Sequence, residues 1–124
     1  MNIERMKVGD NVFVYGTLRP GEYNFRLMDG RCEVKGEATL PDAVLYHLGG
    51  YPGLKLKEGA GIVTGTFCTI TDETLPKRLD QLEGYPNLYD RKEVMTSLGK
   101  AWVYIYNYDV DKASVIASGN WYNK

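Results

Sequence analysis

The stretch from Lys100 to Tyr108 constrains the possible folds most, because it carries large apolar side chains on both faces of an extended strand. Side chains alternate between the two faces of a strand. One face carries Trp102, Tyr104, Tyr106 and Tyr108, and the other carries Ala101, Val103 and Ile105. Such a strand needs cover on both sides, which predicts a closed or strongly curled sheet with a helix packed against it.

Several other stretches have the β-branched and aromatic composition of strands and are separated by turn residues. The segment Arg91–Ser97 is expected to form a hairpin with the aromatic strand around Leu98-Gly99, and Asn24–Met28 is expected to form a short helical turn. The remaining expected strands are Asn11–Tyr15, Cys32–Leu40, Ala43–His47, Leu54–Leu56 and Ile62–Thr71.

One longer helix is predicted to begin after Thr74 and to end at Gly84. Thr74 is a suitable N-cap, and Pro76 falls in the first turn, where its missing N–H costs nothing. An apolar stripe at i, i+4 and i+7 is formed by Leu75, Leu79 and Leu82. Asp80, on the same helix, is expected to face solvent.

About six strands accompany one or two helices, without the strand–helix alternation of α/β folds. The prediction is an α+β fold, a small curled, barrel-like mixed β-sheet of about six strands with one or two packed helices. The chain of 124 residues has no internal repeat, linker or low-complexity tract, so residues 1–124 are expected to form a single domain.

The charge balance excludes several classes of partner. Fifteen basic and sixteen acidic residues are spread along the chain and give a net charge of −1, which favours neither nucleic acid nor an anionic membrane. The N-terminus lacks the apolar core of a signal peptide, and no apolar run has the roughly 18 residues of a membrane span. A cytoplasmic location is expected, and no obligate protein partner is indicated.

Histidine and cysteine are too scarce for many catalytic or metal sites. His47 is the only histidine and lies in an expected strand, where an ordinary hydrogen-bonded role is the preferred interpretation over a ligand role. Cys32 and Cys68 do not form a Cys-x-x-Cys pair. We interpret them as buried thiols, with a disulfide or a nucleophile as the alternatives. No metal site is predicted.

The segment Tyr15-Gly16-Thr17-Leu18-Arg19 follows an apolar strand and leads directly into Pro20-Gly21. A strand that ends in a tight loop leaves backbone N–H groups free to bind an anion or a carbonyl oxygen. Gly16 would let a substrate approach the backbone closely. The alternative is a purely structural strand–turn; a phosphate loop is excluded, because no Gly-Lys-Ser/Thr follows.

Glu83 stands at the last residue of the predicted helix, just before the stop signal Gly84. A negative charge there faces the negative end of the helix dipole, which disfavours ionisation by roughly 0.3–1 kcal/mol. A carboxylate in such a position is a candidate for proton transfer. The alternative is a solvated carboxylate at a helix end.

These residues match a known family over positions 11–121. The matching pieces are Val14–Arg19 with Gly21 and Asn24, Gly36, Leu45-Tyr46, Tyr51–Leu54, Val63–Gly65, Leu79–Tyr85, Tyr89–Arg91, Ala101–Tyr106 and Ser118–Trp121. With them the chain resembles the gamma-glutamylcyclotransferase-like proteins, in the branch of gamma-glutamylamine cyclotransferase and the antibiotic-biosynthesis enzymes. It departs from the family at Phe25, where many relatives have His, and at Asn120, where relatives often have Asp.

The resemblance implies a six-stranded barrel-like fold and a gamma-glutamyl cyclotransferase that needs no cofactor. The α-amine of a gamma-glutamyl amine, amino acid or peptide would attack its own γ-carbonyl and release 5-oxoproline. Glu83 would be the general acid/base, and the backbone of Tyr15, Gly16, Thr17 and Leu18 would hold the glutamyl group. Asn24 and Tyr89 are possible pocket residues; helix capping is the alternative for Asn24, and sheet stabilisation is the preferred role of Tyr89 and Arg91.

Two other classes of function compete with the enzyme. One is a non-catalytic protein that holds a small acidic metabolite in the same pocket. A pure binder of an anion would gain nothing from a second negative charge at Glu83, which favours the enzyme. The other is an interaction protein that uses its aromatic strand as an adhesive edge.

Overall fold

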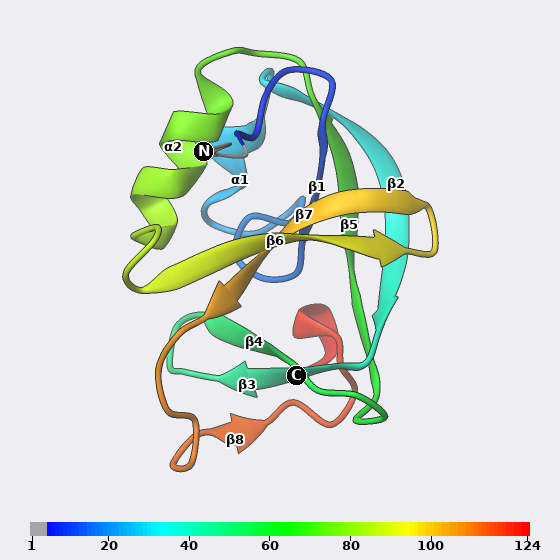
Figure 1. The fold of residues 1–124 in the computed structure, drawn as a ribbon, viewed down its shortest axis with the longest axis vertical. Helices are drawn as coiled ribbons and strands as arrows, with labels where there is room; N and C mark the ends of the chain where they lie inside the picture. The colour runs from blue at the N-terminus through cyan, green and yellow to red at the C-terminus, as the bar shows by residue number, and fades with distance from the viewer. Residues whose placement is uncertain (1–4) are drawn as a thin grey trace.

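The computed structural model describes residues 5–124, which form two β-sheets and two α-helices (Figure 1). The helices are α1 (Phe25–Met28) and α2 (Leu75–Glu83). The strands are β1 (Asn11–Val14), β2 (Cys32–Pro41), β3 (Ala43–His47), β4 (Pro52–Leu56), β5 (Ile62–Ile70), β6 (Tyr89–Thr96), β7 (Gly99–Tyr106) and β8 (Ser114–Val115). A 3₁₀ turn, Trp121–Asn123, lies near the C-terminus.

The larger sheet has five strands in the order β2-β5-β1-β7-β6, and the smaller has three in the order β4-β3-β8. The larger sheet is mixed, because β1 is antiparallel to β5 but parallel to β7. The chain passes from one sheet to the other between β2 and β3 at Asp42, which has a φ of 58° and accepts a hydrogen bond from the backbone N–H of Gly59. The α+β class and the mixed, curled sheet are as predicted.

Both faces of the central strands are buried. On β7, Trp102 and Tyr104 pack with α2 and the N-terminal side of the molecule, whereas Ala101 and Val103 pack between the two sheets. On the neighbouring strand β1, Val12 packs on the same side as Trp102, and Phe13 packs on the same side as Val103. The strand with large apolar side chains on both faces is therefore covered on both faces, as predicted.

The observed sheet differs from the predicted one in three details. Eight strands are formed by the described residues, because a C-terminal strand, β8, adds to β3. These strands divide into two sheets with no strand ladder between them, so the part of the chain in the structure does not form a closed barrel. Tyr108, expected at the end of the aromatic strand, lies beyond β7 and is exposed.

Helix α2 follows its predicted signals at both ends, with Thr74 at the N-cap, Pro76 in the first turn and Gly84 in the left-handed conformation at the C-cap. Thr74 does not cap with its side chain; its N–H and hydroxyl both donate to Asp72 Oδ1. Leu75 and Leu79 are fully buried, but Leu82 is 41% exposed. The apolar stripe is therefore shorter than the sequence predicted.

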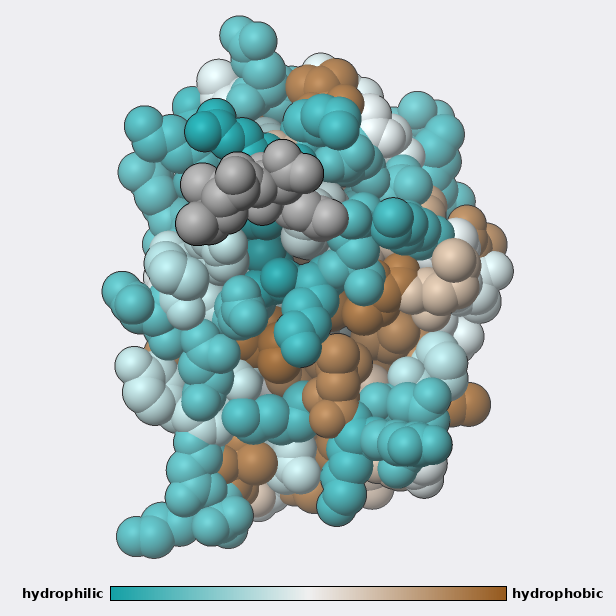
Figure 2. All heavy atoms as spheres, in the orientation of Figure 1, coloured by the Kyte–Doolittle hydropathy of each residue, from teal (hydrophilic) through white to brown (hydrophobic). Residues whose placement is uncertain are grey.

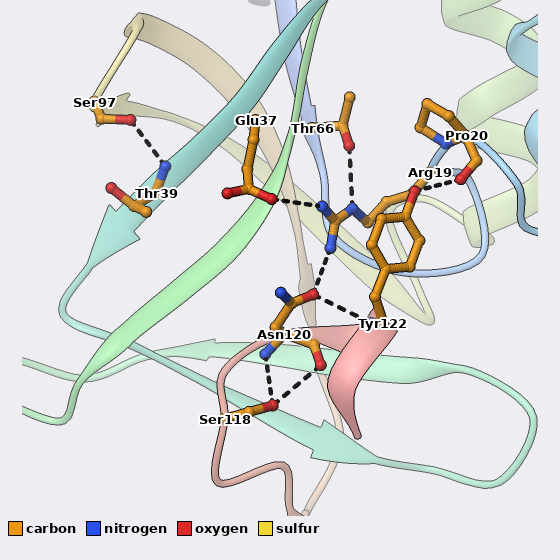
Figure 3. A network of polar contacts seen from close by, with 9 residues as sticks. All are labelled: Arg19, Pro20, Glu37, Thr39, Thr66, Ser97, Ser118, Asn120 and Tyr122. Atoms are coloured by element: carbon orange, nitrogen blue, oxygen red, sulfur yellow. Dashed lines mark hydrogen bonds and ion pairs between the residues drawn. The ribbon is translucent and has the colours of Figure 1, made fainter.

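The buried Arg19 joins the loop after β1 to the C-terminal segment (Figure 3). Its Nε donates to Thr66 Oγ1 at 3.0 Å and its Nη1 to Asn120 Oδ1 at 2.7 Å. The ring of Tyr122 lies 3.8 Å from the guanidinium carbon, and the Tyr122 hydroxyl donates to the carbonyl of Pro20. These contacts fix where the loop leaves the sheet.

Hydrophobic side chains on the face seen in Figure 2 gather near its middle, around the β6–β7 hairpin, with hydrophilic side chains around them. The hairpin contributes two exposed apolar residues, Met95 at 66% and Leu98 at 50%. Among the described helices, none has the length and apolar character needed to cross a membrane.

Candidate active site

A cavity of about 510 Å³ lies where three parts of the fold meet: the loop after β1, the turn from β3 to β4, and the C-terminal end of α2. In Figure 1 the β3–β4 turn and the lower end of α2 lie on the same side of the molecule. The lining consists of Phe13, Val14, Tyr15, Gly16, Thr17, Leu18, Tyr23, Asn24, Gly50, Tyr51, Pro52, Leu82, Glu83, Leu88, Tyr89 and Tyr104. The volume is in the range of about 300–1,000 Å³ typical of small-molecule sites.

The loop after β1 brings unused backbone donors to this cavity. The N–H groups of Gly16, Thr17 and Leu18 donate to no acceptor among residues 5–124. Asn24 holds the loop in place, because its backbone N–H donates to the carbonyl of Thr17 and its side-chain amide donates to Thr17 Oγ1 at 2.9 Å. Consecutive free N–H groups in a loop can bind an anion or a developing oxyanion.

Gly16 makes room for another wall of the cavity. A Cβ at this position would meet the ring of Pro52, with Cδ at 2.6 Å. The sequence had suggested that Gly16 lets a substrate approach the backbone. The structure gives a further reason for glycine, because its missing side chain lets the start of β4 pack directly on the loop.

Glu83 is half-buried at the C-terminal end of α2, and desolvation by burial raises the pKa of its carboxyl to about 7. The alternative of a fully solvated helix-end carboxylate does not fit this environment. Gly84 ends the helix with a φ of 63°, and its N–H donates to the carbonyls of Asp80 and Gln81. No hydrogen-bond partner of the Glu83 carboxylate is found in the described part of the chain.

Two tyrosines close to Glu83 direct their hydroxyl protons elsewhere. Tyr15 donates to the carbonyl of Tyr104 at 2.8 Å, and Tyr89 donates to the carbonyl of Pro52 at 2.8 Å. Burial, followed by the nearby charge of Glu83, raises the pKa of Tyr15 and of Tyr89. These phenols therefore stay protonated, and the carboxylate remains free to exchange a proton with a ligand.

Asp80 does not face solvent as the sequence suggested. It accepts two parallel hydrogen bonds from Arg91, Nε to Oδ1 at 3.0 Å and Nη2 to Oδ2 at 3.2 Å. The Tyr104 hydroxyl also donates to Oδ1, at 2.7 Å. Asp80 thus holds one tyrosine of the cavity wall in place, and the stabilising role expected of Arg91 is realised through this ion pair.

The structure brings the predicted site residues together. Glu83, the loop from Tyr15 to Leu18, Asn24 and Tyr89 all line the one cavity, although their chemical roles stay predictions. Asn24 precedes α1 but makes no side-chain cap there. Sequence reasoning missed the positions of Tyr23, Tyr51 and Tyr104. The signals for them were the number of tyrosines, ten in the chain, and, for Tyr51 and Tyr104, their place in the pieces that match the family.

Residues that were weighed for other chemistry lie elsewhere. Cys32 and Cys68 are free thiols next to one another on β2 and β5. The ring of His47 packs against that of Trp121, with the two ring centres 5.3 Å apart. In residues 5–124, no group of three or more His, Cys, Asp or Glu side chains is arranged to hold a metal ion.

Comparison with known proteins gives the family. Residues 12–123 match the model of the family described as gamma-glutamyl cyclotransferase, AIG2-like. The chain belongs to this family. A member from Vibrio cholerae, provisionally named a gamma-glutamylcyclotransferase, is 42% identical over 110 residues, which cover 89% of this chain and 93% of that protein. The gamma-L-glutamyl-butirosin B gamma-glutamyl cyclotransferase of Niallia circulans is 39% identical over 111 residues, which cover 80% of this chain and 68% of that protein.

Solved structures share the fold of this gamma-glutamyl cyclotransferase family member. The solution structure of YtfP from Escherichia coli superposes with a TM-score of 0.71 at 34% identity and covers 90% of this chain and 95% of that one. The crystal structure of an uncharacterized protein from Pyrococcus horikoshii gives a TM-score of 0.77 at 25% identity. The superposition covers 90% of this chain and 89% of that one. The resemblance noted in the sequence is confirmed.

Proposed function

We propose that this protein is a gamma-glutamyl cyclotransferase, which releases 5-oxoproline and an amine from a gamma-glutamyl compound, with Glu83 as general acid/base. The observation that carries the proposal is a carboxyl with a pKa of about 7, on the wall of the cavity that the free N–H groups of the loop also line. Catalytic acids and bases work best with a pKa near the working pH. Relatives named for the same reaction support the assignment.

The first step of the proposed reaction is removal of a proton from the substrate's α-ammonium group. An ammonium nitrogen has no free electron pair and cannot attack, so ionised Glu83 takes one of its protons. The free amine then attacks the γ-carbonyl carbon of the same molecule, and a C–N bond closes the five-membered ring. The carbonyl electron pair moves to oxygen, which becomes an oxyanion.

The second step breaks the original amide bond. The oxyanion re-forms the carbonyl and expels the amine nitrogen, to which Glu83 returns its proton. The surplus proton of the ring nitrogen also ends on the released amine. The products are therefore the neutral lactam ring of 5-oxoproline and a protonated amine, and Glu83 is again ionised.

In this proposal the loop after β1 binds the negatively charged groups of the substrate. The N–H groups of Gly16, Thr17 and Leu18 bind the oxyanion or the α-carboxylate. Loss of one such donor typically costs on the order of a hundredfold in rate. Because the attack is intramolecular, the other task of the cavity is to fold the glutamyl chain so that amine and carbonyl meet.

The direct test is incubation of the purified protein with a panel of gamma-glutamyl amines, amino acids and peptides, with detection of 5-oxoproline. We expect product from at least one compound with the wild type and none above background with Glu83→Gln. Binding of these compounds without 5-oxoproline would contradict the proposal and support the non-catalytic metabolite binder instead.

A further inference from the structure

The rim of the cavity carries exposed apolar surface from three separate parts of the chain. Tyr23 is 73% exposed, Tyr51 is 42% exposed, and Leu82 on α2 is 41% exposed. Single exposed apolar residues are ordinary on a protein surface. These three differ because all of them line the same cavity, whose inner wall contains the buried side chains of Tyr15, Tyr89 and Tyr104.

Recognition at this rim is not ionic. Within the described residues, the lining contains no lysine, arginine or histidine, and Glu83 is its one charged side chain. Arg26 lies outside the lining and holds Tyr23: its Nη2 donates to the Tyr23 hydroxyl at 2.6 Å, and its guanidinium carbon lies 4.3 Å from the ring centre. Tyr23 is thus positioned in advance as a flat, apolar wall.

The position of the glutamyl group determines what meets the rim. This step rests on the proposed function: the α-amine must reach Glu83, and the carboxylate or oxyanion must reach the loop. The glutamyl unit then fills the inner end of the cavity of about 510 Å³. The amine attached to its γ-carbonyl points to the remaining space, bounded by Tyr23, Tyr51 and Leu82.

We propose that Tyr23, Tyr51 and Leu82 form a leaving-group subsite that selects gamma-glutamyl amides whose amine carries an aromatic or large apolar group. Such a group removes the exposed faces of these residues from water, and the gain grows with the apolar area buried. A small amine such as methylamine would leave the faces of these three residues exposed to water.

The test compares two substrates with the same glutamyl end, gamma-glutamyl benzylamide and gamma-glutamyl methylamide. The measured quantity is the ratio of their kcat/KM values in each variant, because the intrinsic reactivity of the two amides cancels when variants are compared. A missing apolar contact typically costs an enzyme pocket about 10- to 200-fold in kcat/KM. We therefore expect the benzyl-to-methyl ratio to fall at least about tenfold in the double variant Tyr23→Ala/Tyr51→Ala.

The matched control is Tyr108→Ala, which removes a tyrosine that is 53% exposed but lies outside the cavity lining, and its ratio should equal that of the wild type. Leu82→Ser repeats the test from the helix side and keeps it valid if a tyrosine variant is unstable. The wild-type ratio should also persist in about 1 M salt, where charges are screened within roughly 3 Å.

The outcomes separate this inference from the proposed function. A ratio that stays unchanged in both the double variant and Leu82→Ser overturns the subsite, while turnover of both amides leaves the proposed function standing. A ratio that falls equally in Tyr108→Ala also overturns it. If neither these amides nor any other gamma-glutamyl compound yields 5-oxoproline with the wild type, the proposed function itself fails.

Discussion

Arg19 and Glu83 are charged side chains that the fold removes from water, and their surroundings are opposite. Arg19 is 1% exposed, yet it donates to Thr66 and Asn120 and stacks on Tyr122. Glu83 is half-buried, and within residues 5–124 its carboxylate has no hydrogen-bond partner, because the neighbouring phenols donate to other groups.

The difference distinguishes a charge that stabilises the fold, on Arg19, from a carboxyl that is free to exchange a proton, on Glu83. Partners that satisfy a buried charge keep it ionised and fix its neighbours. A carboxyl that is desolvated without partners instead shifts its pKa, here to about 7, so that both protonation states are accessible near neutral pH. We expect substitutions at Arg19 to act on stability and substitutions at Glu83 to act on catalysis.

The largest effect is expected for Glu83→Gln, which keeps the shape of the side chain and removes only its titration. A general acid/base usually contributes about 10²- to 10⁴-fold, so kcat should fall by at least a hundredfold while Tm does not fall. The readout is 5-oxoproline formation at saturating substrate. Glu58→Gln, the same change at an exposed position, is the control; retention of more than about a tenth of wild-type kcat in Glu83→Gln would exclude Glu83 as the proton carrier.

The second effect is a loss of stability in Arg19→Met. Arg19→Met leaves Thr66 Oγ1 and Asn120 Oδ1 without their donor, and a buried polar group left without a partner typically costs about 1–3 kcal/mol. Urea unfolding should show this loss, and Arg78→Met, at an exposed arginine, should change stability little. If Arg19→Met were as stable as the wild type, the contrast between the two buried charges would be wrong.

The third effect is a pH dependence of stability that belongs to Glu83. Its pKa is raised from an ordinary value of 4.5 to about 7 in the folded state, so its contribution is full below about pH 4.5 and is lost as the pH rises through 7. At about 1.4 kcal/mol per pKa unit, the loss is on the order of 3–4 kcal/mol. In chemical unfolding from pH 4 to 9, Glu83→Gln should lack this decline, whereas Glu58→Gln should retain it.

The smallest effect is a gain of stability in Asn120→Asp. Among residues 5–124, Arg19 forms an ion pair with Glu37 alone, at 3.8 Å and with a Glu37 side chain 67% exposed, while Asn120 itself is neutral. An aspartate would keep the oxygen that accepts from Arg19 and add an opposite charge, worth roughly 1 kcal/mol. The gain should vanish as the pH falls below about 4, when the new carboxyl is protonated. Asn123→Asp, in the same turn, is the control, and an equal gain there would point to net charge rather than to Arg19.

Short-range patterns predicted the frame of the site well. The alternation along β7 predicted a strand covered on both faces, and the Leu79–Gly84 stretch predicted a helix that ends at a carboxylate. Both features depend only on neighbouring residues and on the period of the element. The loop after β1 was equally visible, as a strand followed at once by Pro20-Gly21.

Long-range polar contacts were not predictable in the same way. Asp80 was expected in solvent because helical spacing cannot reveal that Arg91 and Tyr104 come from β6 and β7 to meet it. The partners of Arg19 lie 47 and 101 residues away along the chain. Which of the ten tyrosines reach the cavity depends likewise on how the turn between β3 and β4 folds over the loop.

Pro52 links two walls of the cavity, and this contact bears on how a ligand enters. Its ring fills the space left by the absent side chain of Gly16, and its carbonyl accepts the hydroxyl proton of Tyr89 from β6. The loop, the start of β4 and the inner wall are therefore expected to move as one rigid unit on the timescale of binding. Movement of the cavity wall is left to outer positions that no such contact fixes, so entry and exit of ligands would be governed by the motion of Leu82 rather than by a hinge in the sheets.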